Sequence, residues 1–284
     1  MKKIQLKFFF VALLGFAVAM TACKKDEETQ IETTDTSSSE YDALAEIIFT
    51  DVGNITSEAY DLGSGNFKST DDEADIIGEC ATITLDTISV PHILTIDFGE
   101  ENCLCKDGRY RRGKIITTFT GRYREPGTII THGFEDFYVN DNHVEGSRIV
   151  SNMGFNDDGN MYWTIEVESQ ITLAPEDETE GGNTFGWNSS RVREWIEGID
   201  TYMKWDDVYL TTGTAEGVRP SGLGWSREII IPLRKEMSCR FIVSGSIEIT
   251  PDEKPVRLLD FGNGDCNNIA TVTVDGKTHT IHLR

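Results

Sequence analysis

Residues 162–168 have the sequence Tyr-Trp-Thr-Ile-Glu-Val-Glu, in which large apolar residues alternate with more polar ones. Successive side chains of a β-strand point to opposite faces, so Trp163, Ile165 and Val167 would share one apolar face. The same period of two recurs within residues 115–120, 241–249 and 270–274. We therefore expect strands that each bury one face, with Trp163 in the core.

Short turn sequences separate these stretches, namely Asn140-Asp141-Asn142, Asp157-Asp158-Gly159-Asn160 and Asp275-Gly276. Asn, Asp and Gly readily adopt the backbone conformations that tight hairpin turns require. Their spacing predicts roughly a dozen antiparallel strands in a meander. The predicted fold is mostly β: an extended antiparallel meander over residues 80–284 that forms a curved sheet or a sandwich.

The segment 40–79 has a different pattern. Apolar residues recur at helical spacing from Tyr41 to Ile55, which predicts one N-terminal amphipathic helix over roughly residues 40–60. A loop rich in Gly, Ser and Asp completes this segment. Residues 23–39 contain few large apolar groups, so we expect them to form a disordered tether.

The chain begins with Met-Lys-Lys, followed by an apolar run over residues 8–22 and then Cys23. A basic start, a short apolar stretch and small residues before a cysteine are typical of a lipoprotein signal peptide. The run is shorter than the roughly 18–20 apolar residues that a transmembrane helix needs. We expect residues 1–22 to be removed and acyl chains such as palmitate on Cys23 to hold the protein on a membrane.

The charged run Lys24, Lys25, Asp26, Glu27 and Glu28 follows the cysteine. It resembles the export tag that sends lipoproteins of the Bacteroidota to the outer face of the outer membrane, which implies a place on the cell surface. As an ordinary charge run it would only open the tether. The periplasmic face is then the alternative location.

The composition is strongly acidic, since 48 Asp and Glu against 26 Lys and Arg give the 284 residues a net charge of −22. Removal of residues 1–22 takes away three lysines and no acid, which brings the net charge to −25. Such a surface repels nucleic acid. We therefore expect no nucleic-acid partner.

Six cysteines are present, and lipidation of one leaves an odd number to pair. Cysteines outside the cytoplasm usually form disulfides, so one thiol should stay free. Cys239 and Cys266 are symmetric about a turn between two prolines, which suits a cross-strand disulfide. Cys80 would pair with Cys103 or with Cys105, and the sequence does not choose between them.

Two blocks of the sequence echo each other around these cysteines. Asp97-Phe98-Gly99 and Asp260-Phe261-Gly262 each stand six residues before a cysteine, and another cysteine opens a strand some way upstream of each. Each block is followed by a Gly-Lys pair at the start of another strand. The domain over residues 80–284 is therefore predicted to contain the same Cys–hairpin–Cys unit twice.

Three stretches resemble uncharacterised outer-membrane and surface lipoproteins of the Bacteroidota. They are Asp-Gly-Arg-Tyr-Arg-Arg-Gly-Lys at 107–114, Arg-Glu-Trp-Ile-Glu-Gly at 193–198, and Asp-Phe-Gly at 260–262 with Cys-Asn-Asn at 266–268. The resemblance covers most of residues 80–284. It implies a location in the envelope and a β-rich C-terminal domain, and it implies no activity.

The catalytic and metal-binding patterns are missing from the sequence. It has no nucleophile elbow, no phosphate-binding glycine loop and no His-Glu-x-x-His, and Cys103-x-Cys105 lacks the two-residue gap of a zinc knuckle. Glu166 and Glu168 share a strand face about 6.5–7 Å apart, within the range of glycosidase carboxylates. Two solvated acids on a wet strand face give the same pattern, so we expect no enzymatic activity, no cofactor and no metal.

Two features offer binding chemistry. Trp187 and Trp195 flank a polar stretch and are expected to be exposed, where their rings would stack on a sugar. Arg109, Arg111 and Arg112 belong to a basic cluster that would hold a phosphate or a carboxylated glycan. The alternative for the basic cluster is internal pairing with the many acids of the chain.

The sequence thus predicts a non-enzymatic, membrane-anchored lipoprotein with a binding or structural role in the cell envelope, and a glycan or an envelope protein as its partner. One alternative is a surface protein that binds glycans through the tryptophans or cleaves them with the two glutamates. Another is a carrier on the periplasmic face, whose curved sheet would hold an apolar ligand.

Overall fold

The computed structural model describes residues 37–64, 76–175, 182–201 and 203–283. The predicted signal peptide, Cys23 and the run Lys24–Glu28 lie outside the described residues. In chain order the elements are α1 (Ser37–Gly63), β1 (Thr82–Asp86), β2 (His92–Asp97), β3 (Cys103–Leu104), β4 (Tyr110–Phe119), β5 (Ile129–Val139), β6 (Asn142–Phe155), β7 (Met161–Thr172), β8 (Thr184–Glu197), the 3₁₀ helix η2 (Lys204–Asp206), β9 (Val208–Val218), β10 (Gly224–Glu236), β11 (Ile242–Pro251), β12 (Arg257–Asn263), β13 (Ile269–Val274) and β14 (Lys277–His282).

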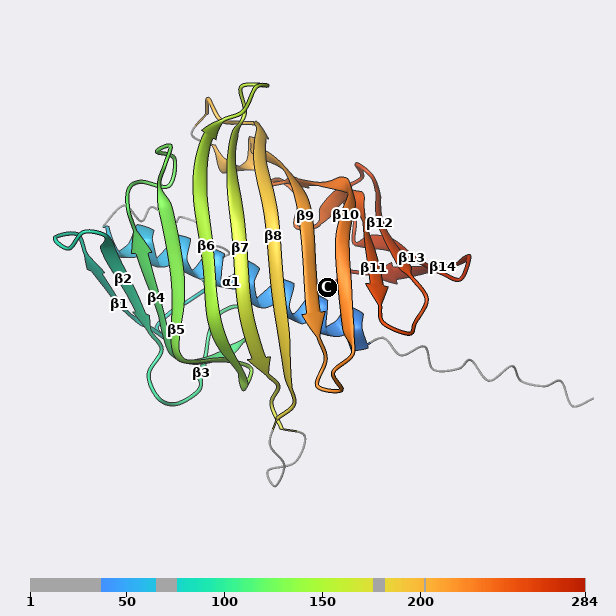
Figure 1. Ribbon diagram of the computed structural model, residues 1–284. Helices are drawn as coiled ribbons and strands as arrows, with labels where there is room; N and C mark the ends of the chain where they lie inside the picture. Colours follow the sequence, from blue (N-terminus) through green and yellow to red (C-terminus); the bar gives the residue numbers. More distant parts are fainter. Residues whose placement is uncertain (1–36, 65–75, 176–181, 202, 284) are drawn as a thin grey trace, which may run out of the picture. The chain divides into compact units, whose positions relative to one another are not determined.

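The strands form one antiparallel sheet of 14 strands (Figure 1). Each strand pairs with the next along the chain, except that the two-residue β3 lies beside β4, so β2 pairs with β4 directly. The sheet is open, with β1 and β14 at its two edges. The predicted antiparallel meander is confirmed. The sandwich alternative is wrong, because the strands of the described residues belong to a single sheet.

Strand β7 follows the alternation of its sequence. Trp163, Ile165 and Val167 are buried, whereas Glu166 and Glu168 are exposed. The prediction that Trp163 belongs to the core is confirmed. We call the side of the sheet with the buried residues the helix-side face, because α1 lies on it, and the other side the outer face.

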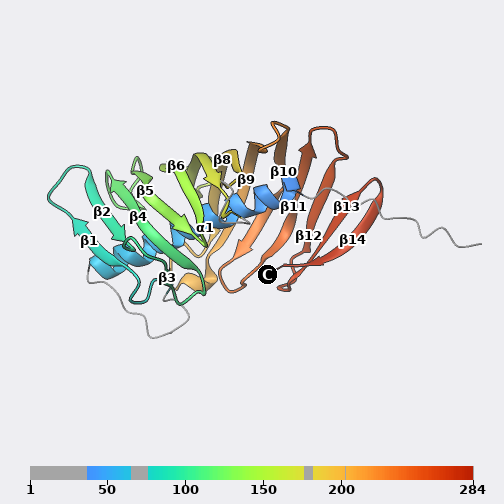
Figure 2. The ribbon, with the colours of Figure 1, turned by 90° about the horizontal axis from the view of Figure 1, so that it is seen from below.

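Helix α1 crosses the strands on the helix-side face (Figure 2). It includes the residues 40–60 for which a helix was predicted. Ala45, Phe49 and Ile55 are fully buried, and the Phe49 ring stacks on Trp187 with the ring centroids 5.7 Å apart. A single sheet must cover its apolar face with another layer, and α1 is that layer over part of the face.

Two disulfides close two hairpins of the sheet. Cys80 pairs with Cys103 around β1 and β2, and Cys239 pairs with Cys266 around β11 and β12, with Cα–Cα distances of 5.6 and 5.7 Å. Among the described cysteines, Cys105 is the free one, and it is buried. The predicted pairing is therefore confirmed, and the choice that the sequence left open falls on Cys103.

Each of the two hairpins ends in a turn of the same kind. Oδ1 of Asp97 accepts a hydrogen bond from the backbone N–H of Gly99 at 2.9 Å, and Oδ1 of Asp260 accepts one from Gly262 at 2.7 Å. Both glycines have a positive φ, of 81° and 90°, which a residue with a Cβ rarely adopts. The likeness ends there, because the Gly-Lys pair of the first block lies in β4 beside β2, whereas that of the second starts β14, which pairs with β13.

Candidate functional site

The two tryptophans predicted to be exposed are buried. Trp187 and Trp195 lie in β8, and their exposed fractions are 0% and 1%. The indole of Trp187 donates to Oδ1 of Asp42 at 2.9 Å, and that of Trp195 donates to the carbonyl oxygen of Glu197 at 2.6 Å. The prediction is wrong because the residues between them form a strand with polar side chains on both faces. These rings therefore offer no platform for a sugar.

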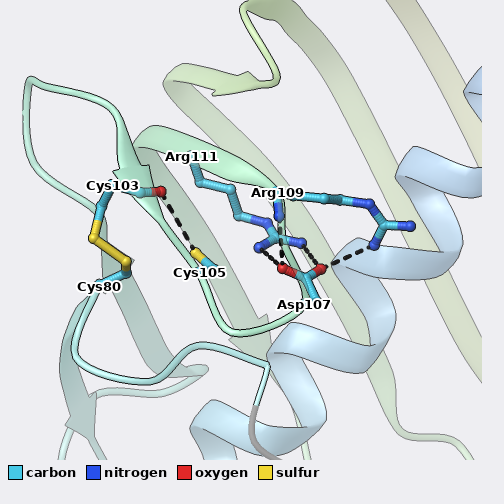
Figure 3. The surroundings of a disulfide bond; sticks show 6 residues. All are labelled: Cys80, Cys103, Cys105, Asp107, Arg109 and Arg111. Carbon is cyan, nitrogen blue, oxygen red and sulfur yellow. Dashed lines mark hydrogen bonds and ion pairs between the residues drawn. A yellow bond between two sulfur atoms is a disulfide. The ribbon is translucent and has the colours of Figure 1, made fainter.

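Arg109 and Arg111 pair with carboxylates of the protein itself (Figure 3). Nη2 of Arg111 lies 2.7 Å from Oδ2 of Asp51 in α1, and Nη1 lies 2.9 Å from Oδ1 of Asp107. Arg109 reaches the same two carboxylates, at 2.9 and 3.0 Å. The Arg111 side chain is 0% exposed, and burial raises the pKa of its partner Asp51. These ion pairs hold α1 against β4 and leave no free guanidinium for a ligand.

Arg112 is also engaged within the protein. It pairs with Asp141, donates to Oδ1 of Asn102 at 2.8 Å, and lies 3.7 Å from the centroid of the Tyr138 ring. An open hollow of about 580 Å³ adjoins Arg112, with His143 in its lining. For Arg109, Arg111 and Arg112, the structure thus agrees with the alternative interpretation, internal pairing.

Charged side chains also hold α1 on the middle of the sheet. Nη1 of Arg227 in β10 lies 3.0 Å from Oδ2 of Asp42 and 3.0 Å from Oε2 of Glu46, and Glu46 pairs in addition with Arg191 of β8. Burial alone would raise the pKa of Glu46, but the two guanidinium groups outweigh it and lower that pKa to about 2. The helix-side face thus holds an ionised carboxylate between two arginines.

The helix-side face carries further positive side chains around this pair. Arg148 of β6 and Arg191 and Arg193 of β8 stand directly opposite buried residues of β7, and directly opposed residues of antiparallel strands project from the same face. Arg124, in the connection between β4 and β5, reaches this face and lies 4.3 Å from the centroid of the Trp195 ring. We call Arg124, Arg148, Arg191 and Arg193 the arginine cluster.

Three members of the arginine cluster lack a neutralising partner. Arg191 pairs with Glu46, but Arg124, Arg148 and Arg193 have no carboxylate within ion-pair distance among the residues that the structure describes. The Arg193 guanidinium lies 4.0 Å from the centroid of the Tyr209 ring. Cation–π contacts of this kind stabilise a positive charge without cancelling it.

Burial and like charges act together on Arg148. Its Nη2 lies against α1, at 3.2 Å from where a Cβ atom on Gly53 would be. Burial and the charges of Arg191 and Arg193 lower the pKa of Arg148 to about 10. On β5 beside it, the buried ring of His132 donates through Nδ1 to the Arg148 carbonyl oxygen at 3.1 Å, and burial and the Arg148 charge lower its pKa to about 3. This part of the face carries an excess of positive charge.

The remaining predicted features lie elsewhere. Glu166 and Glu168 are exposed on the outer face, where Glu166 accepts a hydrogen bond from Oγ of Ser190 at 2.8 Å. Within the described ranges, no three His, Cys, Asp or Glu residues gather as metal ligands would. None of the helices described there is both long and apolar enough to span a bilayer.

Sequence reasoning overlooked Arg148 and Arg193, although their positions carry a signal. In β8 the odd-numbered residues from Phe185 to Trp195, which include both tryptophans, face the core. Arg191 and Arg193 are among them. A charged residue at a core-facing position is rare unless it is paired or functional.

The chain matches no protein-family model, no curated protein and no solved structure.

Proposed function

We propose that the protein is a lipoprotein of the outer membrane, anchored through Cys23, with a non-enzymatic binding role in the cell envelope. The observation that carries the binding role is the arginine cluster. Arg124, Arg148 and Arg193 lack carboxylate partners in the described part of a chain that has 48 acidic and 26 basic residues. Six described arginines pair with carboxylates, so three neighbouring arginines on one face without a carboxylate partner favour an anion from outside.

The alternatives have less support. A carrier of an apolar ligand would need the helix-side face, where α1 buries Phe49 and Ile55 completely. Glycan cleavage would need a walled pocket that separates the pKa values of its two carboxylates, whereas Glu166 and Glu168 are exposed on the outer face. A purely structural role would account for the ion pairs of α1 but not for the unneutralised members of the arginine cluster.

Labelled palmitate tests the anchor. Wild-type protein should incorporate the label, and Cys23→Ala should not, because the acyl chains that give stable membrane attachment have no other site. Cys105→Ala is the matched control, since it removes the buried free thiol, and it should keep the label. Label that survives in Cys23→Ala would contradict the anchor.

External protease added to intact cells tests surface display. Wild-type protein should be degraded, whereas replacement of Lys24–Glu28 by alanines should protect it and leave it in the membrane fraction. A wild-type protein that is protected in intact cells and cleaved after lysis would instead lie on the periplasmic face.

A further inference from the structure

We infer that the arginine cluster binds its ligand through a phosphate group, held between Arg148 and Arg193 on the helix-side face. The inference rests on the proposed binding role and adds the chemical class of the ligand. It does not depend on the lipid anchor.

The register of the sheet places three members of the cluster on one face of two strands that flank β7. Only β7 separates β6 from β8, and neighbouring strands lie about 4.8 Å apart. Arg148 is opposite Val167 of β7, and Arg193 is opposite Trp163, four residues earlier in the same strand. Arg191 is opposite Ile165, which lies between these two β7 residues. The effect of Arg191 and Arg193 on the pKa of Arg148 agrees with this proximity.

The carboxylates near the cluster are already engaged. Asp42 and Glu46 balance Arg191 and Arg227. A further carboxylate, that of Asp207, accepts a hydrogen bond from the hydroxyl of Tyr209 at 3.2 Å. Three positive charges of the cluster therefore remain without a counterpart in the described chain, and a multiply charged anion fits them best.

The carboxylate of Glu46 shows how this face binds an oxyanion within the protein, because it forms ion pairs with the guanidinium groups of Arg191 and Arg227. The planar fork of arginine donates two parallel hydrogen bonds to carboxylate or phosphate oxygens. A phosphate monoester carries about −1.5 to −2 charges near pH 7, so one phosphate offsets Arg148 and Arg193 together. A carboxylate would offset only one of them.

The cluster can be reached from solvent. Arg124 is exposed, and Arg148 and Arg193 are partly exposed. The core beyond them is closed, because the Tyr123 ring stacks on Trp163 with the ring centroids 5.0 Å apart. The phosphate would therefore occupy the cluster while the rest of the ligand extends into solvent, which suits both a soluble phosphate monoester and a phospholipid whose headgroup is a phosphate monoester.

Isothermal titration calorimetry of the full chain in a neutral detergent tests the inference. The probes are inorganic phosphate, glycerol 3-phosphate and dihexanoyl phosphatidic acid, at low salt because ions screen exposed charges, with protein-free micelles as the blank. Binding of at least one probe is expected. Similar affinities for the two esters assign a soluble ligand, and a preference of about tenfold or more for the lipid assigns a headgroup.

Two variants place the site on the cluster. The double variant Arg148→Gln, Arg193→Gln should bind at least about tenfold more weakly, since it removes both forks. Arg240→Gln is the matched control, because Arg240 is exposed in the connection between β10 and β11 and lies 5.7 Å from the Phe241 ring centroid. Its loss should leave the affinity unchanged. If the double variant fails to fold, Arg193→Lys, which keeps the charge and loses the fork, should still weaken binding severalfold without lowering the melting temperature.

Failure of all three probes to bind would overturn the inference, and so would equal affinities of the wild type and the variants. Glucuronate, titrated as a carboxylate probe, tests the alternative anion. Binding of glucuronate and of none of the phosphate probes would refute the phosphate ligand but would still support an anion-binding role. The palmitate experiment reports on the anchor whichever of these results is found.

Discussion

Replacing His132 by glutamine should make the fold less sensitive to acid. His132 is 2% exposed in β5, and its Nδ1 donates to the Arg148 carbonyl oxygen at 3.1 Å. Burial and the positive charge of Arg148 lower the pKa of the ring from 6.5 to about 3. The folded protein thus keeps a neutral imidazole at pH values where the unfolded chain binds a proton. Glutamine can still donate to the carbonyl and does not titrate.

The size of the effect follows from the two pKa values. Between pH 6.5 and about 3 the unfolded chain binds more protons at this ring than the folded chain, so the free energy of unfolding falls as the pH falls through this window. Integration gives a loss of about 2 kcal/mol between pH 7.5 and pH 5. The loss reaches about 5 kcal/mol once both states are protonated below pH 3.

Urea denaturation followed by tryptophan fluorescence at pH 7.5 and pH 5 measures this difference. Between these pH values the wild type should lose about 2 kcal/mol more than His132→Gln. His279→Gln, which changes an exposed residue of β14, should behave as the wild type does. Equal losses in the wild type and His132→Gln would refute the reasoning, because His132 would then titrate alike in both states.

Three further outcomes are expected. Thiol counting on denatured, non-reduced lipidated protein should give one thiol, that of Cys105, whose pKa burial raises in the fold; a count of three would contradict the disulfides. Trp187→Phe should lower the free energy of unfolding in urea by about 1–3 kcal/mol, because Oδ1 of Asp42 loses its indole donor, and an unchanged midpoint would speak against that bond. Asp51→Asn should cost about 3 kcal/mol by calorimetry, because the fully buried Arg111 loses one of two carboxylates; an unchanged melting temperature would contradict this.

The strand order could be predicted because it depends on local features. Alternation such as that from Trp163 to Val167 fixes which face of a strand is buried, and short turns make consecutive strands neighbours. The choice between a single sheet and a sandwich depends instead on what covers the apolar face. That cover comes from α1, through contacts such as Phe49 with Trp187, and no local pattern encodes a contact between residues so distant in sequence.

The candidate site was harder to predict for the same reason. The polar residues between Trp187 and Trp195 resemble a loop, because Arg191 and Arg193 occupy core-facing positions that usually carry apolar residues. Arg191 is tolerated there because it pairs with Glu46, which lies 145 residues earlier in the chain. A search for charged residues at the alternate positions of a strand that face the core would have found both arginines. It would not have shown which of them has a carboxylate partner.

The distribution of acids along α1 connects the fold to the proposed binding. A buried ion pair is weak evidence for stability, since an apolar pair of similar volume often does as well or better. The positive charge of the helix-side face therefore needs a reason other than stability. Asp42, Glu46 and Asp51 of α1 neutralise Arg227, Arg191 and Arg111. Arg148, which also lies against the helix, and Arg193 extend the same positive surface without a carboxylate partner in the described residues. One positive surface that binds both the carboxylates of the helix and an external oxyanion accounts for the paired and the unpaired arginines.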